Sequence, residues 1–231
     1  MERIPAQLRD VRGRIARACA AVKRPVESVT LLAVGKTFPP AALRAAFDAG
    51  QRAFGENYAQ EALAKIEALA DLRPRTEWHL IGPLQSNKTR EVAAAFDWVH
   101  AIDRAKIAER LSAQRPAGMA PLQVCLQVNV SAEASKSGVV PAEAMPLALA
   151  VAAMPNLRLR GLMAIPEPAG GFEAQRRPHR ALRELLEALQ AADPRLARLD
   201  TLSMGMSADL EAAIAEGATI VRVGSAIFGA R

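Results

Sequence analysis

One lysine stands where an apolar segment ends. Residues 31–36 read LLAVGK, so Lys36 follows four apolar residues and a glycine, and only six of the 30 basic residues in the chain are lysines. A lysine held against apolar walls loses hydration, so its pKa falls and the neutral amine can form a Schiff base with a carbonyl compound. The alternative is a lysine whose stem packs while its ammonium group reaches water.

Two turns of small residues could bind an anion. The segments RVGSA (222–226) and SMGMS (203–207) each follow apolar residues. Glycine and serine at the start of a helical turn offer backbone N–H groups and a hydroxyl to a phosphate. Such turns are also common as purely structural features. Their combination with a lysine at another strand end is a more specific indication of a phosphate-containing ligand.

Arg222 alternates with Ile220 and Gly224 and is therefore expected to point away from the side that Val221 and Val223 occupy. A buried arginine stays charged and needs an acceptor. That acceptor could be a carboxylate of the protein or the aromatic ring nitrogen of a cofactor. In the second case the ring nitrogen would stay unprotonated, because arginine cannot accept a proton, and the cofactor would be a poor electron sink.

The other polar candidates have ordinary structural explanations. His79 in EWHLIG is typical of a buried core histidine, and Asn57 in GENY is typical of a turn. The chain has three histidines and contains neither HExxH nor CxxC, so no metal site is expected. Of the other lysines, three are expected to be solvated on helices or just past one and two to be secondary candidates in loops: Lys23, Lys65 and Lys106 in the first group, Lys88 and Lys136 in the second.

The elements that must position these residues alternate strictly between strand and helix. Eight strand-like apolar segments are found, at 28–34, 51–55, 77–82, 97–102, 122–130, 157–165, 199–205 and 219–224. Amphipathic helical patterns lie between them, as parallel strands require. The pattern before the seventh strand, HRALRELLEALQAA, is expected to begin at His179, directly after Pro178. Eight units of roughly 29 residues favour a closed α/β barrel, the (β/α)8 TIM barrel, with function at the loops after the strands.

The two ends of the chain are expected to complete one domain over residues 1–231. The eighth helix is nearly missing, since the last strand is followed only by SAIFGAR. An amphipathic stripe from Ile4 to Val22 predicts an N-terminal helix within residues 1–24, ended by Pro25, that packs on the barrel and covers the gap.

Composition excludes several other classes of protein. The net charge is +6, but the arginines are scattered over predicted helix faces, so nucleic-acid binding is not expected. Cys19 and Cys125 lie in apolar patterns and are expected to be buried hydrophobic residues. The N-terminus lacks the continuous apolar core of a secretory signal, and no apolar stretch is long enough to span a bilayer, so we expect a cytoplasmic protein.

Seven stretches together are more distinctive than any single turn. In order they are LLAVGKT, FGENYAQE, EWHLIGPLQSNK, VNVSAEASKSG, GLMAI, LSMGMSADLEAAIAEG and VRVGSAIFGAR. From about residue 28 to the C-terminus the chain resembles the YggS/PROSC family of pyridoxal-phosphate-binding proteins. The resemblance implies a single barrel of fold-type III, like the N-terminal domain of alanine racemase.

The resemblance also implies how the residues act. Pyridoxal 5′-phosphate (PLP) would be attached to Lys36 as an internal aldimine, and Arg222 would meet the pyridine nitrogen. Four small residues fall where the family binds the phosphate: Ser203, Gly205, Gly224 and Ser225. Asn57 and His79 fall in motifs that line the family's pocket. Gly35 and Phe38 depart from the serine and the basic residue that are common in the family, so no role can be assigned to a second lysine at position 38.

Two classes of function remain open after this resemblance. The family implies a non-catalytic carrier that buffers PLP, regulates PLP and amino-acid balance, and makes transient contact with PLP-dependent apo-enzymes; we expect it to be monomeric and to bind neither nucleic acid nor membrane. The enzymatic alternative is an amino-acid racemase or decarboxylase, but the only tyrosine, Tyr58, lies in the barrel itself and not in a second domain facing the lysine. A Schiff-base aldolase acting on a sugar phosphate is a third reading. Lys136 is a candidate second amine in cofactor transfer.

Overall fold

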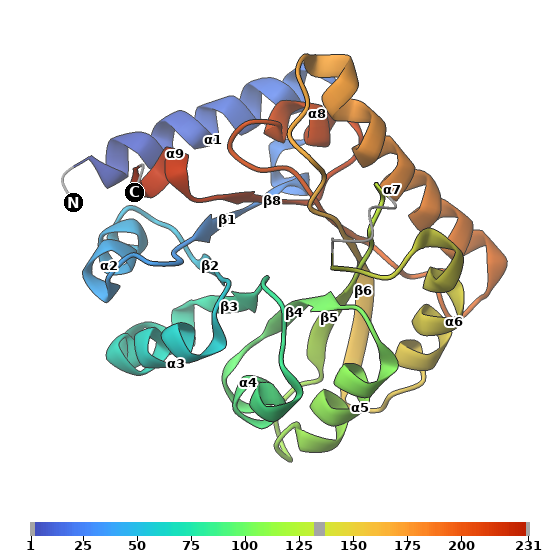
Figure 1. Cartoon of the computed structure of the whole chain (residues 1–231). Coiled ribbons are helices and arrows are strands. Elements are labelled where there is room, and N and C mark those ends of the chain that lie inside the picture. The colour runs from blue at the N-terminus through green and yellow to red at the C-terminus, as the bar shows by residue number, and fades with distance from the viewer. Residues whose placement is uncertain (1–2, 132–136, 230–231) are drawn as a thin grey trace.

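Eight parallel strands form a closed barrel in the computed structural model, which describes residues 3–131 and 137–229 (Figure 1). The strands are β1 (Thr30–Val34), β2 (Ala53–Glu56), β3 (Glu77–Leu80), β4 (Trp98–Ile102), β5 (Leu122–Gln127), β6 (Leu157–Met163), β7 (Thr201–Ser203) and β8 (Ile220–Val223). Each strand pairs with the next along the chain, and β8 closes the ring on β1. The predicted (β/α)8 barrel is therefore confirmed; seven strands lie within the segments expected from the sequence, and β2 extends one residue past its segment, to Glu56.

Helices surround the barrel and connect successive strands (Figure 1). They are α1 (Ile4–Ala21), α2 (Pro40–Asp48), α3 (Ala59–Ala68), α4 (Thr89–Ala95), α5 (Ala105–Gln114), α6 (Pro141–Ala152), α7 (Phe172–Ala192), α8 (Leu210–Ala215) and α9 (Ser225–Phe228). Three short 3-10 helices lie in the connections: Val26–Ser28, Ala70–Arg75 and Ser86–Lys88. Gly50 and Gly217 follow helix ends with φ of 87° and 94°, the left-handed conformation that glycine adopts without strain.

The barrel strands bury both of their faces. An apolar cluster fills the interior of the ring: Leu32, Val34, Ala53, Ile81, Trp98, Ala101, Cys125, Met163 and Ile220. A larger cluster lies between the strands and the helices, and Val221 and Val223 belong to it. Ile220 therefore faces inward and Val221 outward, and the alternation of β8 directs Arg222 into the barrel, as the sequence predicted.

Helix α1 packs against the part of the barrel that α8 and α9 leave open (Figure 1). Its buried stripe consists of Ile4, Leu8, Val11, Ile15 and Cys19. Arg14 also forms an ion pair with Glu211 of α8, with an N–O distance of 2.8 Å. Helix α1 thus lies on the side of the barrel that α9, with only four residues, does not cover alone.

Helix α7 begins earlier than the sequence pattern indicated. We expected helical structure from His179, after Pro178, but the helix starts at Phe172 and contains Pro178 in its second turn. Proline removes only one backbone donor, and a helix of 21 residues keeps its other hydrogen bonds. Gly171, with φ of 83°, provides the turn that precedes it.

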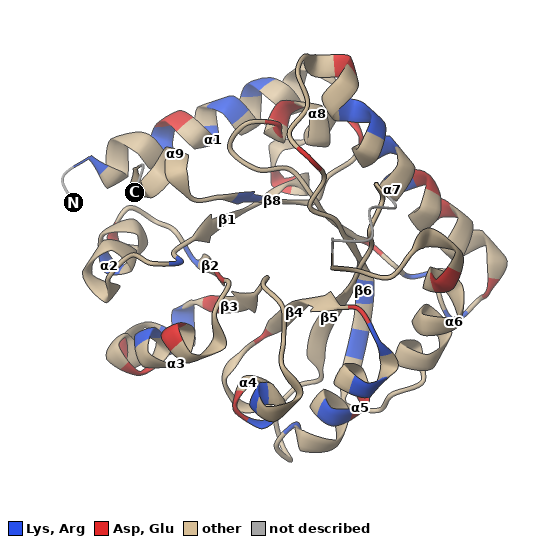
Figure 2. Ribbon diagram, in the orientation of Figure 1, with Lys and Arg blue, Asp and Glu red and all other residues tan. Residues whose placement is uncertain are grey.

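Charged residues are spread over the outer helices. In Figure 2, α3, α5 and α7 each carry both basic and acidic segments, whereas α1 carries a single acidic residue among several basic ones. Within the described ranges, no helix is both long enough and apolar enough to cross a lipid bilayer.

Candidate functional site

A cavity of about 570 Å³ lies at the end of the barrel where the strands finish. The described residues that line it come from the loops after β1, β2, β3, β6, β7 and β8: Val34, Lys36, Phe38, Asn57, Ile81, Ile165, Met206, Ser207, Ala208, Arg222, Gly224, Ser225 and Gly229. Its size is within the range of small-molecule sites. Five of the eight site residues expected from the sequence line it: Lys36, Asn57, Arg222, Gly224 and Ser225.

Lys36 lies two residues after the end of β1. It is half-buried and lines the cavity together with Val34 and Ile81. The chain bends sharply after it, because Thr37 has φ of 68°. A non-glycine residue adopts this left-handed conformation only where its surroundings hold it there. The Thr37 N–H donates to Glu61 Oε1 at 2.5 Å, and the Gly35 N–H donates to the Gly55 carbonyl at 2.9 Å. The backbone on both sides of Lys36 is thus fixed by hydrogen bonds.

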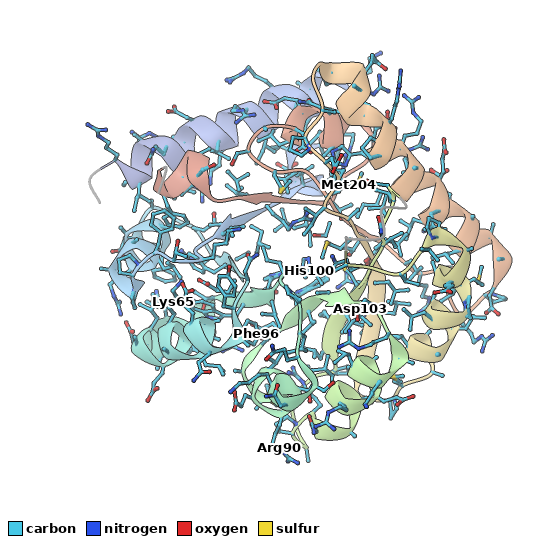
Figure 3. All side chains as sticks on the ribbon, viewed as in Figure 1. Lys65, Arg90, Phe96, His100, Asp103 and Met204 are labelled. Carbon is cyan, nitrogen blue, oxygen red and sulfur yellow. The ribbon has the colours of Figure 1, made fainter. Side chains whose placement is uncertain are left out.

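Lys65 is buried, which contradicts the expectation that it is solvated. It is 4% exposed, and its Nζ lies 2.8 Å from Glu56 Oε1, 2.6 Å from Glu61 Oε1 and 2.6 Å from the Gly35 carbonyl oxygen. Lys65 belongs to α3 and is labelled in Figure 3, and its contacts join that helix to the end of β2 and to the turn after β1. The expectation failed because the helical pattern gives no sign that two carboxylates and a carbonyl meet at this point.

Arg222 is 4% exposed and reaches the cavity from inside the barrel. Its Nη1 donates to the Ser203 carbonyl at 2.5 Å and to Ser203 Oγ at 2.8 Å, and its Nη2 donates to the Ala164 carbonyl at 2.8 Å. Burial lowers the pKa of Arg222 to about 10, so the guanidinium remains charged at neutral pH. Three of its five N–H groups are used in these bonds, and two are left for a ligand.

A buried hydrogen-bond chain continues from Arg222 into the barrel. His100 Nδ1 lies 2.8 Å from Ser203 Oγ, and His79 Nδ1 lies 3.0 Å from His100 Nε2. Figure 3 shows His100 in the interior of the ring of strands. Burial lowers the pKa of both histidines, so both rings are neutral at pH 7.

The first bond of this chain has a fixed direction. Arginine only donates, so Ser203 Oγ accepts from Arg222. Where the Ser203 O–H in turn donates to His100 Nδ1, His100 carries its proton on Nε2 and donates to His79 Nδ1. His79 Nε2, which carries the remaining proton, is buried without a hydrogen-bond partner among the described residues and lies 3.8 Å from Glu77.

The loop after β7 is fixed by contacts on its side away from the cavity, while Met206, Ser207 and Ala208 line the cavity. Gly205 has φ of 90°, and a Cβ there would lie 2.5 Å from the Ala213 Cβ, so only glycine fits. The Met206 N–H donates to Asp209 Oδ1 at 2.6 Å, and His179 Nε2 lies 3.0 Å from Asp209 Oδ2. Burial alone would raise the pKa of Asp209, but the hydrogen bonds from His179 and Met206 outweigh it and lower that pKa.

Two hydroxyl groups from neighbouring loops meet beside this turn. Ser225 Oγ donates to Ser207 Oγ at 3.2 Å, and Ala208 lies next to them on the cavity wall. Gly224 precedes Ser225, and a Cβ at Gly224 would lie 3.1 Å from the Val34 carbonyl oxygen. The end of β8 can therefore approach β1 closely, which brings these small residues to the same cavity as Lys36.

Asn57 supplies an acceptor to the cavity wall. It lines the cavity, and its Oδ1 is buried without a hydrogen-bond partner in the part of the chain that the structure describes. Such atoms are rare in proteins because leaving one unpaired is costly. A ligand donor would satisfy this one.

Three expected site residues do not line the cavity. His79 and Ser203 belong to the hydrogen-bond chain that supports Arg222, and Gly205 shapes the turn before Ser207. Met206 and Ser207 line the cavity and belong to the SMGMS turn expected to bind an anion, although neither was named as a site residue; Ala208, which follows them, was not predicted. The candidate second amine, Lys136, lies outside the described residues. The part of the chain described contains no group of three or more His, Cys, Asp and Glu side chains that could hold a metal ion.

Comparisons with known proteins agree with this arrangement. Residues 8–231 match the family described as alanine racemase, N-terminal domain. The chain is 59% identical over 231 residues to the pyridoxal phosphate homeostasis protein of Pseudomonas aeruginosa, covering all of this chain and 97% of the relative. It is 52% identical over 232 residues to the protein of the same name from Escherichia coli K12, covering all of this chain and 98% of the relative.

Among solved structures, PipY of Synechococcus elongatus with PLP bound is 40% identical, with a TM-score of 0.81 over 93% of this chain and all of PipY. The structure of PipY without PLP gives a TM-score of 0.87 over 98% of this chain and all of PipY. The two bacterial relatives and PipY are each at least 40% identical to this chain over at least 93% of its length, which is enough to place them in one family. The chain therefore belongs to the family of pyridoxal phosphate homeostasis proteins, the YggS/PROSC family, whose barrel is that of the alanine racemase N-terminal domain.

Proposed function

We propose that this protein binds PLP covalently through Lys36 and acts as a carrier that buffers PLP and regulates PLP and amino-acid balance. The observation that carries the proposal is the meeting of an amine, a charged guanidinium and a turn of small residues at one cavity of about 570 Å³. PLP has an aldehyde that can bond to the amine, a ring nitrogen that can accept from the guanidinium and a phosphate that fits the turn of small residues. The names of the two bacterial relatives and the PLP-bound structure of PipY support the same ligand.

The residues present fit this ligand. Gly224, Ser225 and Ser207 would hold the phosphate, with Gly205 and Ser203 shaping the same loop from behind. Arg222 would donate to the ring nitrogen, and Asn57 Oδ1 would gain the donor that it lacks. His79 would act through His100 and Ser203 as a positioning residue for Arg222.

Lys36 supplies the covalent bond. Its amine would attach to the aldehyde carbon of PLP with loss of one water, a bond that needs no oxidant or reductant. In enzymes the bound group stabilises a carbanion by acting as an electron sink. Arg222, which donates and does not give up its proton, would hold the ring nitrogen unprotonated and so weaken that property.

The lining of the cavity favours a carrier over an enzyme. Among the described residues that line it, Lys36 and Arg222 are the only titratable side chains. Racemization needs a second base facing the lysine, and Tyr58 is 56% exposed and absent from the described lining. A carrier needs only reversible attachment, which Lys36 and water provide, and transient contact with PLP-dependent apo-enzymes would complete the transfer.

The distinction can be measured with PLP-loaded protein. We expect no change in the enantiomeric ratio of alanine by chiral chromatography after long incubation, and steady activation of an apo-enzyme that requires PLP. The Lys36→Ala variant is the control for covalent loading. Turnover of either enantiomer of alanine by wild-type protein but not by Lys36→Ala would contradict the carrier proposal.

A further inference from the structure

A buried group of charges lies directly behind the Lys36 turn. We call Glu56, Glu61 and Lys65 the Lys65 cluster. Lys65 and Glu56 are 4% and 0% exposed, and Lys65 Nζ lies within 2.8 Å of both carboxylates. None of the three is among the described residues that line the cavity, so the cluster is separate from the groups that would touch PLP.

The cluster contacts the backbone on both sides of Lys36. Lys65 Nζ donates to the carbonyl of Gly35, the residue before Lys36, at 2.6 Å. Glu61 Oε1 accepts the N–H of Thr37, the residue after Lys36, at 2.5 Å. The same Glu61 oxygen lies 2.6 Å from Lys65 Nζ. Lys65 and Glu61 therefore connect the backbone of Gly35 to that of Thr37 through a continuous set of hydrogen bonds on either side of Lys36.

Two features of the residues next to Lys36 fit this arrangement. A Cβ on Gly35 would lie 2.8 Å from Glu56 Oε1, so any larger residue at position 35 would require the Glu56 carboxylate to shift from its present place beside Lys65. Thr37 has φ of 68°, a conformation that costs free energy in a β-branched residue and is held by the Glu61 contact. The turn that carries Lys36 is thus stabilised by charges that lie outside the cavity.

Stability alone does not explain a buried ion cluster. Well-packed apolar side chains of similar volume are often at least as stabilising as a buried ion pair. The three hydrogens of the Lys65 ammonium group have three oxygens within hydrogen-bond distance, each at a defined place. This geometry fixes direction, which apolar packing does not.

We propose that Lys65, with Glu56 and Glu61, is a positioning residue that holds the Lys36 amine in the orientation needed to form and release its bond to PLP. The proposal rests on the proposed function for its ligand. The clamp on the Lys36 turn, however, is a property of the protein without PLP and can be measured separately.

The test compares variants of the whole protein. Lys65→Met with Glu56→Gln removes the buried ammonium group and the fully buried carboxyl group together; the carboxylate that remains, Glu61, has a side chain that is 31% exposed, so the variant is expected to fold. Lys106→Met is the matched control, because Lys106 is exposed on α5. Leu111→Ala, at a fully buried position of α5, provides a variant that is destabilised without any change near Lys36.

Three quantities are measured with pyridoxal 5′-phosphate as the probe. They are the hydrogen-exchange rate of the Thr37 amide without PLP, the rate of appearance of the visible absorption band after PLP is added, and the circular dichroism of that band. The double variant removes the ammonium group that binds the Gly35 carbonyl and holds the Glu61 carboxylate at the Thr37 N–H, and losing hydrogen bonds to a charged group changes an equilibrium by about tenfold or more. We therefore expect Thr37 exchange to be about tenfold faster and loading about tenfold slower in the double variant, with altered dichroism.

The outcomes separate this inference from the proposed function. Unchanged exchange, loading rate and dichroism in the double variant would overturn the positioning role while leaving PLP binding intact. An equal slowing in Leu111→Ala would also overturn it, because general destabilisation would then explain the effect. If wild-type protein failed to load PLP at all, the proposed function would fail, and the Thr37 exchange rates would still decide whether the Lys65 cluster clamps the turn.

Discussion

At the scale of single residues, the site depends on a buried hydrogen-bond chain that begins at Arg222. The Arg222 guanidinium can only donate to Ser203 Oγ, and the chain continues through His100 to His79. The chain holds Arg222 against the cavity wall. It also makes Ser203 more important for structure than its small size indicates.

Two serines distinguish support of the site from direct binding. Ser203→Ala leaves buried groups of Arg222 and His100 without a partner, and we expect it to lower the free energy of unfolding by about 2 kcal/mol. Ser225 is exposed at the cavity, so Ser225→Ala should change stability by less than about 0.5 kcal/mol. The same change should weaken PLP binding by about tenfold through a lost bond to a charged group. Urea unfolding and PLP titration of both variants measure these effects; equal effects of the two variants on stability would contradict the assignment.

Glu56 should make stability depend on pH. Burial raises the pKa of Glu56 from 4.5 to about 7, although Lys65 acts in the opposite direction. Because the pKa in the folded state is above the unfolded value, the contribution to stability is fully present below about pH 4.5 and is lost as the pH rises through about 7. The loss is at most about 3 kcal/mol.

Glu56→Gln removes this titration and is the control. Urea unfolding at several pH values should show that wild-type protein loses stability relative to the variant between about pH 4.5 and pH 7. A constant difference between the two proteins across this range would show that the buried carboxyl group does not titrate there.

Some site residues could be predicted from the sequence and others could not. Lys36 and Arg222 were predicted to reach the cavity because strand alternation fixes the direction of side chains near a strand end. The burial of Lys65 was not predicted, because it depends on two carboxylates, Glu56 at the end of β2 and Glu61 one turn earlier in α3. The bond between His79 and His100 depends on the register of two neighbouring strands, which the pattern of a single strand does not contain.

At the scale of elements, α1 completes the barrel where the last helix is short. The alternation of strands and helices predicted all eight strands, since apolar strands between amphipathic helices have few other arrangements. The start of α7 was placed too late, because a proline inside a helix is read as a boundary even where the helix continues. Helix α1 contacts α8 and α9, which follow the loops that line the cavity.

A core substitution in α1 should therefore affect both stability and binding. Leu8 is fully buried between α1 and the barrel, and Leu8→Ala should lower the free energy of unfolding by about 2–5 kcal/mol. Val22, 36% exposed at the end of the same helix, gives the control variant Val22→Ala. We expect Leu8→Ala also to weaken PLP binding; a loss no larger than that of Val22→Ala would show that α1 is not a structural part of the barrel.

At the scale of the whole molecule, ligand binding should be coupled to folding. PLP at one hundred times its dissociation constant would add about 2.7 kcal/mol, which corresponds to a rise in Tm of about 5–10 °C for a chain of this size. Lys36→Ala should lose most of this rise, since it cannot form the covalent bond. A thermal unfolding series with increasing PLP tests this, and an equal rise in both proteins would indicate binding that does not involve Lys36. One domain over residues 1–231 and a monomeric state stay predictions.

The most direct test of the account is the location of the covalent bond. Wild-type protein is incubated with PLP, treated with borohydride, digested and analysed by peptide mass mapping, with Lys36→Ala as the control. The account predicts one major phosphopyridoxyl adduct, on the peptide that contains Lys36, and its loss in the variant. An adduct spread over other lysines, or one retained in Lys36→Ala, would contradict the assignment of Lys36 as the residue that binds PLP.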